Sequence, residues 1–579
     1  MRADTVRAPL VVDARTPATP PDWREEESKR ICNNVCHVIA VRARIHFSYM
    51  KSVYNASDLP IEEEYDYIIV GGGTAGCPLA ATLSEKYSVL VLERGSVPAA
   101  YPQVLSADGL LRFLIQVDDG NTPAQRFKSE DGVANARGRI LGGSSMINIG
   151  FYSRAEDEFY KESGIQWDMD MVEKAYQWVE ETVVFRSDHL SVWQSIAKQA
   201  LLEAGVGPEN GFSLDHIVGT KVGASIFDED GRRHGAVELL NRGQLANLQI
   251  AVHATVERII FSSDPSGIHI YIYTFTSNFI YVFRLSARGV LYSDSKGKSH
   301  RAHIRDKGEV ILSAGSIGSP QLLLLSGVGP DSELSSQQIP IVHPNPYVGK
   351  FMADNPRNTI NIISPFPLDP SYVQVVGITN DYYIESLSSK VPSSLLPPST
   401  LFPNATFPVD VSVATVGEKI VGPLSTGSLR LASPADVRDN PVVRFNYFED
   451  PVDLARCVSG MRKIGEVLKT ESMDRFKLRG LLGGEGFVYF GAPFPVNPSD
   501  DLSMEVFCKT TVETFWHYHG GCLVGKVVDG DLRVMGINAL RVVDGSTFNR
   551  SPGTNPQATV MMMARYMGLK MLQQRSPSK

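Results

Sequence analysis

The stretch YDYIIVGGGTAG, residues 65–76, decides the fold of this chain. Its first half is a short apolar run rich in β-branched residues, which predicts a buried strand. Its second half is a G-x-G-x-x-G loop, and residues 77–83 predict the start of a helix. A second apolar strand at 88–92 ends in Glu93. This order predicts a βαβ unit that binds a dinucleotide, whereas an isolated glycine turn would indicate little.

Each glycine of the loop has a predicted physical role. Gly71 permits the tight turn, Gly73 lets the backbone approach a pyrophosphate, and Gly76 lets the helix pack closely on the strand. The helix N-terminus offers free N–H groups and a partial positive charge to the phosphates. Glu93 lies about 20 residues further on, where an acidic side chain accepts a hydrogen bond from a ribose hydroxyl.

The composition, 43% hydrophobic and 21% charged, is that of a soluble globular protein. At 579 residues the chain is too long for one hydrophobic core, so we expect at least two domains. Its net charge of −8 argues against nucleic acid or an anionic membrane as the main partner. No apolar run reaches about 18 residues, so no transmembrane helix is predicted. We expect a monomer.

The first 45 residues are irregular and lack the continuous apolar core of a secretory signal. Either the protein is cytosolic, or the start of the gene is wrongly assigned. The sequons at Asn55 and Asn404 would carry glycans only in a secretory compartment.

Six cysteines are too few for a disulfide scaffold. Cys457 and Cys508 could pair only if the fold brings them together. Cys77 is predicted to be a small buried residue of the helix after the glycine loop. Cys32 and Cys36 have no second ligand pair at metal-site spacing, so no metal site is predicted.

Apolar spacing predicts ordinary elements elsewhere. Helical spacing appears at 169–179 and 193–201, and residues 248–260 predict a single strand. Residues 319–321, Ser-Pro-Gln, are predicted to cap a leucine-rich helix. Residues 538–545 are predicted to form a strand that precedes a methionine-rich helix.

The uncharged run IHIYIYTFTSNFIYVF, residues 268–283, is anomalous. It is long for one strand and too short to span a membrane, so a hairpin arm is one interpretation. A translated intron is the other, because Gly267 joined directly to Arg284 would make an ordinary short turn. If translated, the run is an aggregation hazard.

Two further blocks carry candidate chemistry. Residues 138–154, GRILGGSSMINIGFYSR, interleave apolar residues with glycine and serine, which is typical of a loop passing close to a flat ligand and unusual for a surface loop. Residues 516–522, WHYHGGC, contain His517 and His519. A histidine is the natural proton acceptor at neutral pH. A metal site needs a third ligand, and the plainest alternative is one structural and one solvated histidine.

These blocks resemble those of the glucose-methanol-choline (GMC) oxidoreductases, a family of FAD flavoproteins. Residues 71–76 with Glu93 look like the family's dinucleotide motif, 138–148 like its first signature and 315–330 like its second. The likeness runs from about residue 47 to residue 570, apart from the anomalous run. Within the family, the chain is most similar to plant mandelonitrile (hydroxynitrile) lyases and HOTHEAD-type proteins.

The resemblance implies an α/β fold, with a Rossmann-like FAD-binding domain and a second α+β substrate domain built on an antiparallel sheet. It also implies that Cys457 pairs with Cys508. It implies a glycoprotein of the secretory pathway, extracellular or vacuolar, so that the missing signal would be an annotation fault.

The predicted domains alternate along the chain. An N-terminal extension at 1–61 comes first. The FAD-binding segments are then 62–155, 215–342 and 515–575, and the substrate segments are 156–214 and 343–514.

The resemblance assigns the cofactor residues one by one. Thr74 and Ala75 would touch the pyrophosphate, and Glu93 with Arg94 the adenosine side, where the Val256 backbone would meet the adenine. The residues that would line or close over the flavin are Ile140, Ser144, Asn148, Ile149, Gly150, Phe151, Trp516, His517, Asp544, Gly545, Pro556 and Gln557.

The family's catalytic histidine matches His517, not His519. The lyases have a second histidine where this chain has Asn555, tyrosine at Phe515 and cysteine at Glu385. Cyanohydrin cleavage needs a cationic pocket for the departing anion, so an amide at position 555 and a carboxylate at Glu385 make the pocket less suited to cyanide. Alcohol oxidation needs His517 to take the hydroxyl proton and Asn555 to hydrogen-bond the substrate oxygen.

Three functions remain open. The first is an FAD-dependent oxidoreductase acting on the CH–OH group of a small or lipid-like alcohol by hydride transfer to flavin. Here His517 and Asn555 would be catalytic, and Glu385 and Phe515 would contact substrate. The second is an (R)-hydroxynitrile lyase with a non-redox FAD. The third is a non-catalytic flavoprotein.

Overall fold

The computed structural model describes residues 47–107, 116–271, 280–392, 410–479 and 485–575. The N-terminal extension up to residue 46, with Cys32 and Cys36, lies outside these residues, as do the Asn404 sequon and the middle of the 268–283 run. The segment Tyr49–Lys579 forms one unit by its own contacts, and the fold is that of this unit.

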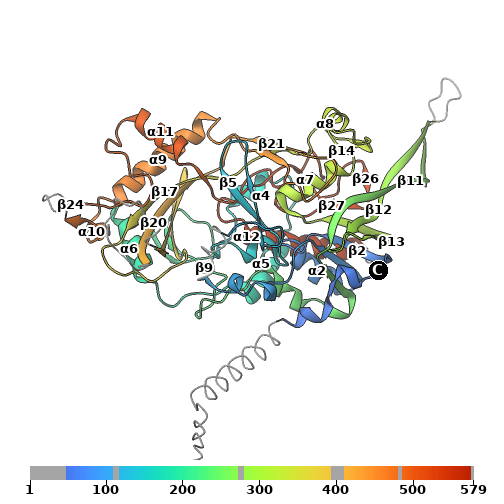
Figure 1. Ribbon diagram of the computed structural model, residues 1–579, viewed down its shortest axis with the longest axis horizontal. Coiled ribbons are helices and arrows are strands. Elements are labelled where there is room, and N and C mark those ends of the chain that lie inside the picture. Colours follow the sequence, from blue (N-terminus) through green and yellow to red (C-terminus); the bar gives the residue numbers. More distant parts are fainter. Residues whose placement is uncertain (1–46, 108–115, 272–279, 393–409, 480–484, 576–579) are drawn as a thin grey trace, which may run out of the picture. The chain divides into compact units, whose positions relative to one another are not determined.

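The predicted βαβ unit lies in a nine-stranded sheet in the described part of the chain (Figure 1). In spatial order its strands are β1 (Val53–Asn55), β10 (Leu248–Val252), β3 (Val89–Glu93), β2 (Glu62–Val70), β13 (Ser299–Leu312), β12 (Ile280–Ser293) and β11 (Thr255–Tyr271), with β26 (Ile537–Asn538) beside β12 and β27 (Leu540–Val542) beside β13. β1 to β13 in this order are parallel, and β12 and β11 continue antiparallel. β3 is buried along its whole length, as expected of a parallel strand covered on both faces.

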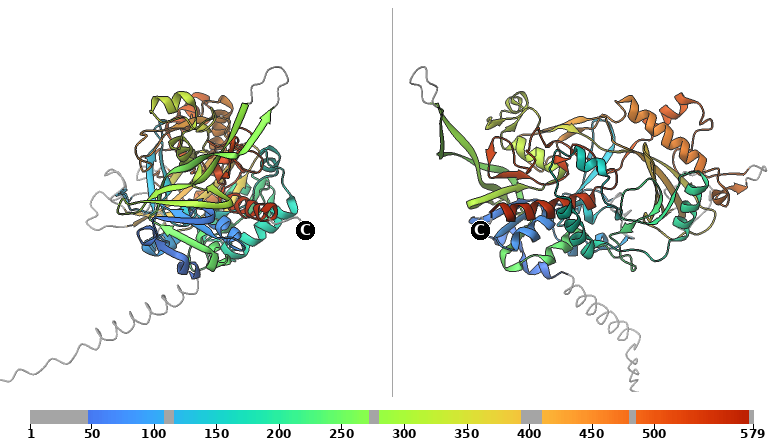
Figure 2. Two further views of the ribbon diagram at one scale, coloured as in Figure 1. Left: turned by 90° about the vertical axis from the view of Figure 1, so that its right-hand side faces the viewer. Right: turned by 180° about the vertical axis from the view of Figure 1, so that it is seen from behind.

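Helices α2 (Gly76–Ser84) and α12 (Gln557–Arg575) pack on each other beside this sheet, and α5 (Met169–Val183) packs on α12 (Figure 2). Every residue of α2 is buried. The two helices approach closely at Gly568, where a Cβ would lie 2.7 Å from Thr82 Cγ2. The predicted methionine-rich helix is therefore a buried support of the glycine loop.

The second sheet has seven strands within the described residues. In spatial order they are β25 (Glu513–Thr514), β17 (Pro356–Ile363), β20 (Asp410–Ile420), β19 (Tyr382–Pro392), β18 (Val375–Ile378), β8 (Gly219–Val222) and β7 (Glu209–Phe212). All neighbours pair antiparallel except β7 and β8. This is the predicted antiparallel substrate sheet. Strand β8 belongs to this substrate sheet, although residue 215 was predicted to begin the next FAD-binding segment. The predicted limits of the domains stay a prediction.

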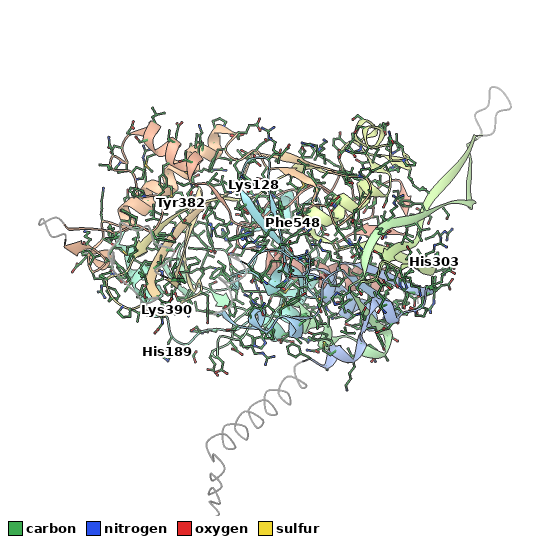
Figure 3. The ribbon with its side chains drawn as sticks, viewed as in Figure 1. Lys128, His189, His303, Tyr382, Lys390 and Phe548 are labelled. Atoms are coloured by element: carbon green, nitrogen blue, oxygen red, sulfur yellow. A yellow bond between two sulfur atoms is a disulfide. The ribbon has the colours of Figure 1, made fainter. Side chains whose placement is uncertain are left out.

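Helices α9 (Pro451–Val467) and α6 (Val192–Glu203) pack on the second sheet. Alternate side chains of a strand point to opposite faces, and β19 illustrates this. Ile384 joins the apolar core shared with α9 and α6, whereas its neighbour Tyr383 joins a separate small cluster with Phe151. Figure 3 labels Tyr382 and Lys390 on β19, and His303 on β13 of the first sheet. The second sheet thus turns one face to its helices and the other toward the first sheet's loops.

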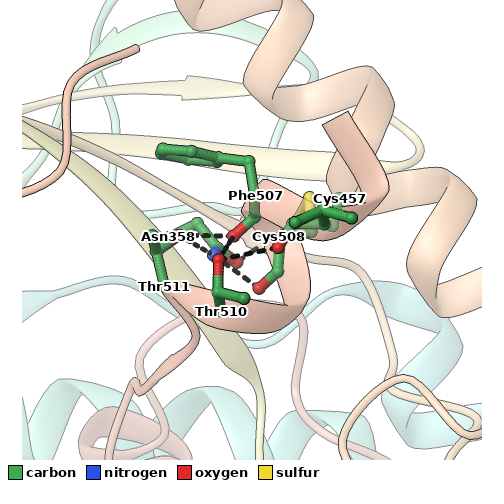
Figure 4. The surroundings of a disulfide bond; sticks show 7 residues. Asn358, Cys457, Phe507, Cys508, Thr510 and Thr511 are labelled. Carbon is green, nitrogen blue, oxygen red and sulfur yellow. Dashed lines mark hydrogen bonds between the residues drawn. A yellow bond between two sulfur atoms is a disulfide. The ribbon is translucent and has the colours of Figure 1, made fainter. Parts of the chain in front are cut away.

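Cys457 of α9 and Cys508 of α11 (Asp501–Thr510) form a disulfide (Figure 4), as the resemblance implied. Asn358 of β17 lies beside it and donates to Cys508 O at 2.9 Å. The disulfide therefore ties α11 to the helix that covers the second sheet. Cys77 is a free, buried cysteine as predicted.

The remaining elements are short. The strands are β4 (Ala124–Lys128) with β5 (Ala134–Gly138), β6 (Phe151–Tyr152) with β9 (Ala224–Ser225), β14 (Val328–Gly329) with β15 (His343–Pro344), β16 (Lys350–Met352) with β21 (Gly427–Arg430) and β22 (Val442–Arg444), and β23 (Leu478–Arg479) with β24 (Glu485–Gly486). The helices are α4 (Asp157–Glu162), α7 (Gly315–Leu325), α8 (Asp331–Ser336) and α10 (Glu471–Asp474).

Three element predictions were wrong in detail. The single strand predicted at 248–260 is two strands, because His253 turns the backbone with φ of 56°. The strand predicted at 538–545 is interrupted in the same way at Ala539, whose φ is also 56°. The leucine-rich helix α7 begins at Gly315 and contains Pro320 in its interior, so residues 319–321 do not cap it.

The anomalous run falls on β11 and β12, which form a long antiparallel hairpin that Figure 1 shows projecting from the first sheet. The hairpin-arm interpretation agrees with this pairing, and the intron hypothesis stays a prediction. Among the described residues, no helix is long and apolar enough to cross a membrane. The same residues hold no group of three His, Cys, Asp or Glu side chains placed to bind a metal.

Candidate active site

A cavity of about 310 Å³ extends from the glycine loop to residues 555–557. Phe515 and Asn555 line it, as do most of the predicted cofactor residues. The latter are Gly71, Gly73, Thr74, Ala75, Glu93, Arg94, Ser144, Asn148, Ile149, Gly150, Phe151, Val256, Trp516, His517, Asp544, Gly545, Pro556 and Gln557.

Gly76, Ile140 and Glu385 do not reach the wall of this cavity. Ile140 is fully buried where the chain pairs with Ser96, and its contact with the flavin stays a prediction. Gly76 lies behind the cavity wall, where it lets the helix that follows the glycine loop pack closely. Glu385 lies near Asn555 outside the cavity wall, and its contact with substrate stays a prediction.

The glycine cradle, residues 71–76, is shaped by close backbone approaches. A Cβ at Gly76 would lie 1.9 Å from Gly71 O, and one at Gly71 would lie 2.6 Å from Ser313 O. Real Cβ atoms do not approach this closely, so only glycine fits at both positions. At Gly73 the nearest protein atoms would be 3.7 and 3.9 Å away. Gly73 therefore presents open backbone to the cavity, which fits the close approach of a pyrophosphate.

Glu93 ends β3 beside the cradle and is held by the backbone. Its Oε2 accepts a hydrogen bond from Gly72 N at 3.0 Å, and its Oε1 accepts one from Gly95 N at 2.8 Å. Burial raises the pKa of this carboxyl. Each oxygen keeps a further lone pair, so Glu93 can still accept a ribose hydroxyl.

Asn148 and Gln557 join the two loops at the flavin end. Asn148 Nδ2 donates to Gln557 Oε1 at 2.8 Å, and Gln557 Nε2 donates to Phe151 O at 2.6 Å. Arg233, fully buried, donates to Asn148 Oδ1 at 2.7 Å and to Asn148 O at 2.6 Å. Sequence reasoning missed Arg233, because no local motif surrounds it.

Asp544 fixes the start of α7 against the loop that follows β27. Its Oδ2 accepts from Gly315 N at 2.9 Å and from Ser319 Oγ at 2.5 Å, and its Oδ1 accepts from Ser546 N at 2.8 Å. The carboxylate thus meets the positive end of a helix, which favours it. Gly545 follows directly and lines the cavity.

His517 lies at the other end of the cavity on a strained segment. Its backbone N donates to Asp354 Oδ1 at 2.9 Å, and the preceding Trp516 has φ of 58°. Asp354 also accepts from the hydroxyls of Thr514 and Tyr447, at 2.6 and 2.5 Å. This buried carboxylate, which sequence reasoning missed, therefore sets the path of the segment that carries His517.

The His517 ring is buried 4.6 Å from the Phe515 ring, centroid to centroid. Its Nδ1 has no hydrogen-bond partner in the described part of the chain. Burial, and next the charge of Lys419, lower the pKa of His517 well below its ordinary value of 6.5. His519 has Nδ1 3.0 Å from His517 O, and burial lowers its pKa to about 4. Both imidazoles are neutral at pH 7.

Asn555 faces the cavity in front of three residues of the second sheet. Tyr383 Oη donates to Asn555 Oδ1 at 3.2 Å. Burial raises the pKa of Glu385 to about 7, with Lys419, Asn555 and Tyr383 opposing the rise. Lys419 Nζ donates to Gly553 O at 2.9 Å, and burial lowers its pKa to about 8. We call these five residues, Tyr383, Glu385, Lys419, His517 and Asn555, the catalytic end of the cavity.

Two family models, both described as GMC oxidoreductase, match residues 65–357 and residues 423–564. The chain belongs to the GMC oxidoreductase family. The resemblance drawn from the motifs is thereby confirmed, and the cofactor of this GMC oxidoreductase is FAD. The open backbone at Gly73 and the acceptor Glu93 fit a dinucleotide at one end of the cavity.

Relatives cover nearly the whole chain. (R)-mandelonitrile lyase 1 of Prunus serotina is 54% identical over 542 residues, which are 94% of this chain and 93% of that protein. Sinalpyl alcohol oxidase Nec3 of Nesocodon mauritianus is 51% identical and covers 92% of each chain. Protein HOTHEAD of Arabidopsis thaliana is 43% identical and covers 90% of each.

Solved structures of the family share the fold. A formate oxidase has a TM-score of 0.72 at 18% identity, covering 89% of this chain and 99% of its own. Pyridoxine 4-oxidase from Mesorbium loti has a TM-score of 0.69 at 20% identity, covering 87% and 98%. The predicted fold class, a Rossmann-like FAD-binding domain with an antiparallel substrate sheet, is confirmed.

Proposed function

We propose that this chain is an FAD-dependent oxidoreductase that oxidises the CH–OH group of a small or lipid-like alcohol, with His517 as the base. The observation that carries the proposal is the buried imidazole of His517, which lines the same cavity as Asn555 and whose Nδ1 has no hydrogen-bond partner in the described part of the chain. Burial lowers the pKa of this imidazole well below its ordinary value. A neutral imidazole is ready to accept a proton at pH 7.

The chemistry that FAD supplies when bound is acceptance of two electrons and a hydrogen from the alcohol carbon, which leaves a carbonyl product. His517 takes the hydroxyl proton, and the Asn555 amide hydrogen-bonds the substrate oxygen as negative charge develops on it. Phe515 and Trp516, both on the wall, offer ring faces to the substrate carbon skeleton. Their apolar surface also excludes water from the reacting atoms.

A second candidate is an (R)-hydroxynitrile lyase, which the 54% identity to a mandelonitrile lyase favours. Against it stands the charge balance at the catalytic end. Cyanide leaves as an anion, and two cations lie near His517. Arg357 lines the cavity and pairs with Glu513 at 2.8 Å, and Lys419 lies outside the cavity wall. Burial raises the pKa of Glu385 to about 7 against the opposing charge of Lys419, and Glu385 offsets that positive charge when it is ionised. A pocket of this kind suits a neutral alcohol better than a departing anion.

The two functions are separated by an anaerobic absorbance spectrum of the purified holoprotein. One sample receives mandelonitrile, and others receive aromatic and long-chain primary alcohols. Bleaching of the oxidised flavin band by an alcohol supports the oxidoreductase. An unchanged flavin band in every sample, with benzaldehyde and cyanide appearing from mandelonitrile, would establish the lyase instead.

We also propose that the protein folds in the secretory pathway. The disulfide between Cys457 and Cys508 supports this, because disulfides persist mainly in oxidising compartments. Asn55, which begins one of the sequons, lies at the surface and is partly exposed. Treatment of the natural protein with a glycosidase should lower its apparent mass, and an unchanged mass would count against a glycoprotein.

A further inference from the structure

The orientation of the Asn555 amide follows from the groups behind it. Its Oδ1 receives the Tyr383 hydroxyl at 3.2 Å in a buried site. Glu385 lies on the same face of β19 as Tyr383, two residues further on, and its carboxyl group interacts with both Asn555 and Tyr383. When it is ionised, Glu385 only accepts hydrogen bonds, so it then faces the amide nitrogen, because Tyr383 already occupies the amide oxygen. The oxygen and one N–H of Asn555 are thereby engaged away from the cavity.

We propose that Tyr383, supported by Glu385, is a positioning residue that holds Asn555 with its remaining N–H toward the cavity and its carbonyl oxygen away from it. The proposal rests on the proposed function, because Asn555 then acts only as a hydrogen-bond donor to the substrate oxygen. Such a site selects ligands that present an acceptor oxygen, of which an alcohol losing its proton to His517 is the strongest.

Tyr383 is well placed to hold one orientation. Its side chain is 1% exposed and packs with Phe151, Val376 and Ile378. The His216 ring stacks on it with centroids 6.1 Å apart and planes 7° from parallel. Lys419 Nζ lies 5.0 Å from the ring centroid. A ring held on several sides cannot turn its hydroxyl away from Asn555 without disturbing the core.

Lys419 supports the same arrangement from the loop side. It pairs with Tyr383 across the β19–β20 ladder, and its Nζ donates to Gly553 O at 2.9 Å. Because Gly553 lies two residues before Asn555, this bond fixes the backbone of the loop that carries the amide. The amide is therefore held at its side chain by Tyr383 and Glu385, and at its backbone by Lys419.

The test is a double-mutant cycle on the holoprotein with Tyr383→Phe, Asn555→Ala and both together. The probe is 2-phenyl-2-propanol, a tertiary alcohol that has no hydrogen on its carbinol carbon and cannot be oxidised. Its binding is followed by the absorbance change of the bound flavin. Tyr383→Phe should raise the dissociation constant about fivefold in the otherwise unchanged chain, as expected for one hydrogen bond. It should change the constant less than about twofold in Asn555→Ala, since the amide it positions is gone.

Tyr382→Phe is the matched control. It removes the same hydroxyl from the neighbouring residue of β19, which faces the helix side of the sheet, and it should leave binding unchanged. Equal effects of Tyr383→Phe in the presence and absence of Asn555 would overturn the positioning role. An unsubstituted holoprotein that fails to bind the tertiary alcohol would overturn it as well.

A parallel measurement separates this proposal from the proposed function. The same variants are mixed anaerobically with benzyl alcohol, and flavin bleaching is followed. If no alcohol bleaches the flavin but the binding cycle shows the coupling, the positioning role stands and the oxidoreductase proposal fails. If alcohols bleach the flavin but the cycle shows no coupling, only the positioning role fails.

Discussion

The glycine cradle and the catalytic end are two ends of one cavity, built in opposite ways. The cradle comes from residues close in sequence, and its acid Glu93 has both oxygens bonded to backbone N–H groups. The catalytic end comes from β19, β20 and two distant loops. There, Glu385 Oε1 and His517 Nδ1 are buried with no partner among the described residues.

Because of this difference, the cradle is suited to binding a cofactor and the catalytic end to reacting with a substrate. The cradle offers a ligand its shape, its backbone N–H groups and the remaining lone pairs of Glu93, so its function depends largely on the absence of side chains at its glycines. A buried polar atom without a partner costs about 1–3 kcal/mol. The catalytic end carries two such atoms. His517 belongs to the cavity wall, so its Nδ1 is the one placed near a substrate, whereas Glu385 Oε1 lies behind Asn555.

The largest expected effect is that of Gly76→Ala in the cradle. The new Cβ would overlap Gly71 O at 1.9 Å, and backbone cannot move aside cheaply, so we expect destabilisation of about 1–3 kcal/mol or more and loss of FAD. Gly73→Ala meets only distant protein atoms, so the apoprotein should unfold at its usual temperature while FAD binding weakens. Thermal unfolding and the ratio of flavin to protein absorbance report both outcomes. Full flavin content in Gly76→Ala would contradict the cradle's dependence on glycine.

The next largest effect is that of His517→Gln at the catalytic end. The substitution removes the base but keeps a side chain of similar reach, so anaerobic flavin reduction by alcohol should slow about 10²- to 10⁴-fold. Flavin content should stay unchanged, because the cradle is intact. A rate within about threefold of the parent would show that His517 is not the base.

A smaller effect is expected of Glu385→Gln, seen in the pH dependence of flavin reduction. With a pKa of about 7, Glu385 loses its proton as the pH rises through neutrality and becomes the anionic acceptor for Asn555. The rate should therefore rise with pH near 7 by about threefold to tenfold, then fall as Lys419 loses its charge near pH 8. In Glu385→Gln the increase in the rate of flavin reduction near pH 7 should vanish. The separate increase caused by loss of a proton from His517 should remain, at a pH below 6.5. A profile that keeps its rise near 7 would exclude Glu385 as its source.

The smallest effect is expected from deletion of residues 268–283. Asp264 pairs with Arg284 in the hairpin, so the deletion leaves Pro265, Ser266 and Gly267 as a three-residue loop between paired residues, a common hairpin length. FAD content and the rate of flavin reduction should match those of the full chain, with less aggregation in light scattering. Loss of FAD on deletion would show that the arm supports the first sheet.

The βαβ unit could be predicted from sequence because its parts are neighbours. Strand, loop, helix and acid lie within residues 65–93, and the structure reproduces them as β2, α2 and β3. The family motifs extended this prediction to the second sheet and to the disulfide of Cys457 and Cys508, both of which the structure contains.

The errors arose where tertiary contacts override local pattern. Pro320 was taken as part of a helix cap, but α7 begins at Gly315, where Asp544 from a distant loop accepts the Gly315 N–H. The apolar run at 248–260 has the composition of one strand, yet a positive φ at His253 divides it. The periodicity of apolar residues indicates which positions are buried, but it does not indicate where a turn divides one strand from the next.

The sequence by itself determined the cradle, the family and its cofactor, because glycine spacing and motif order act over short distances along the chain. Only the tertiary structure decided which residues stand behind Asn555. Tyr383 and Lys419 come together because β19 pairs with β20, and both reach the loop at 553–555 because the two sheets enclose one cavity. No local pattern marks them, since a buried tyrosine or lysine acquires its role only from what the fold places beside it.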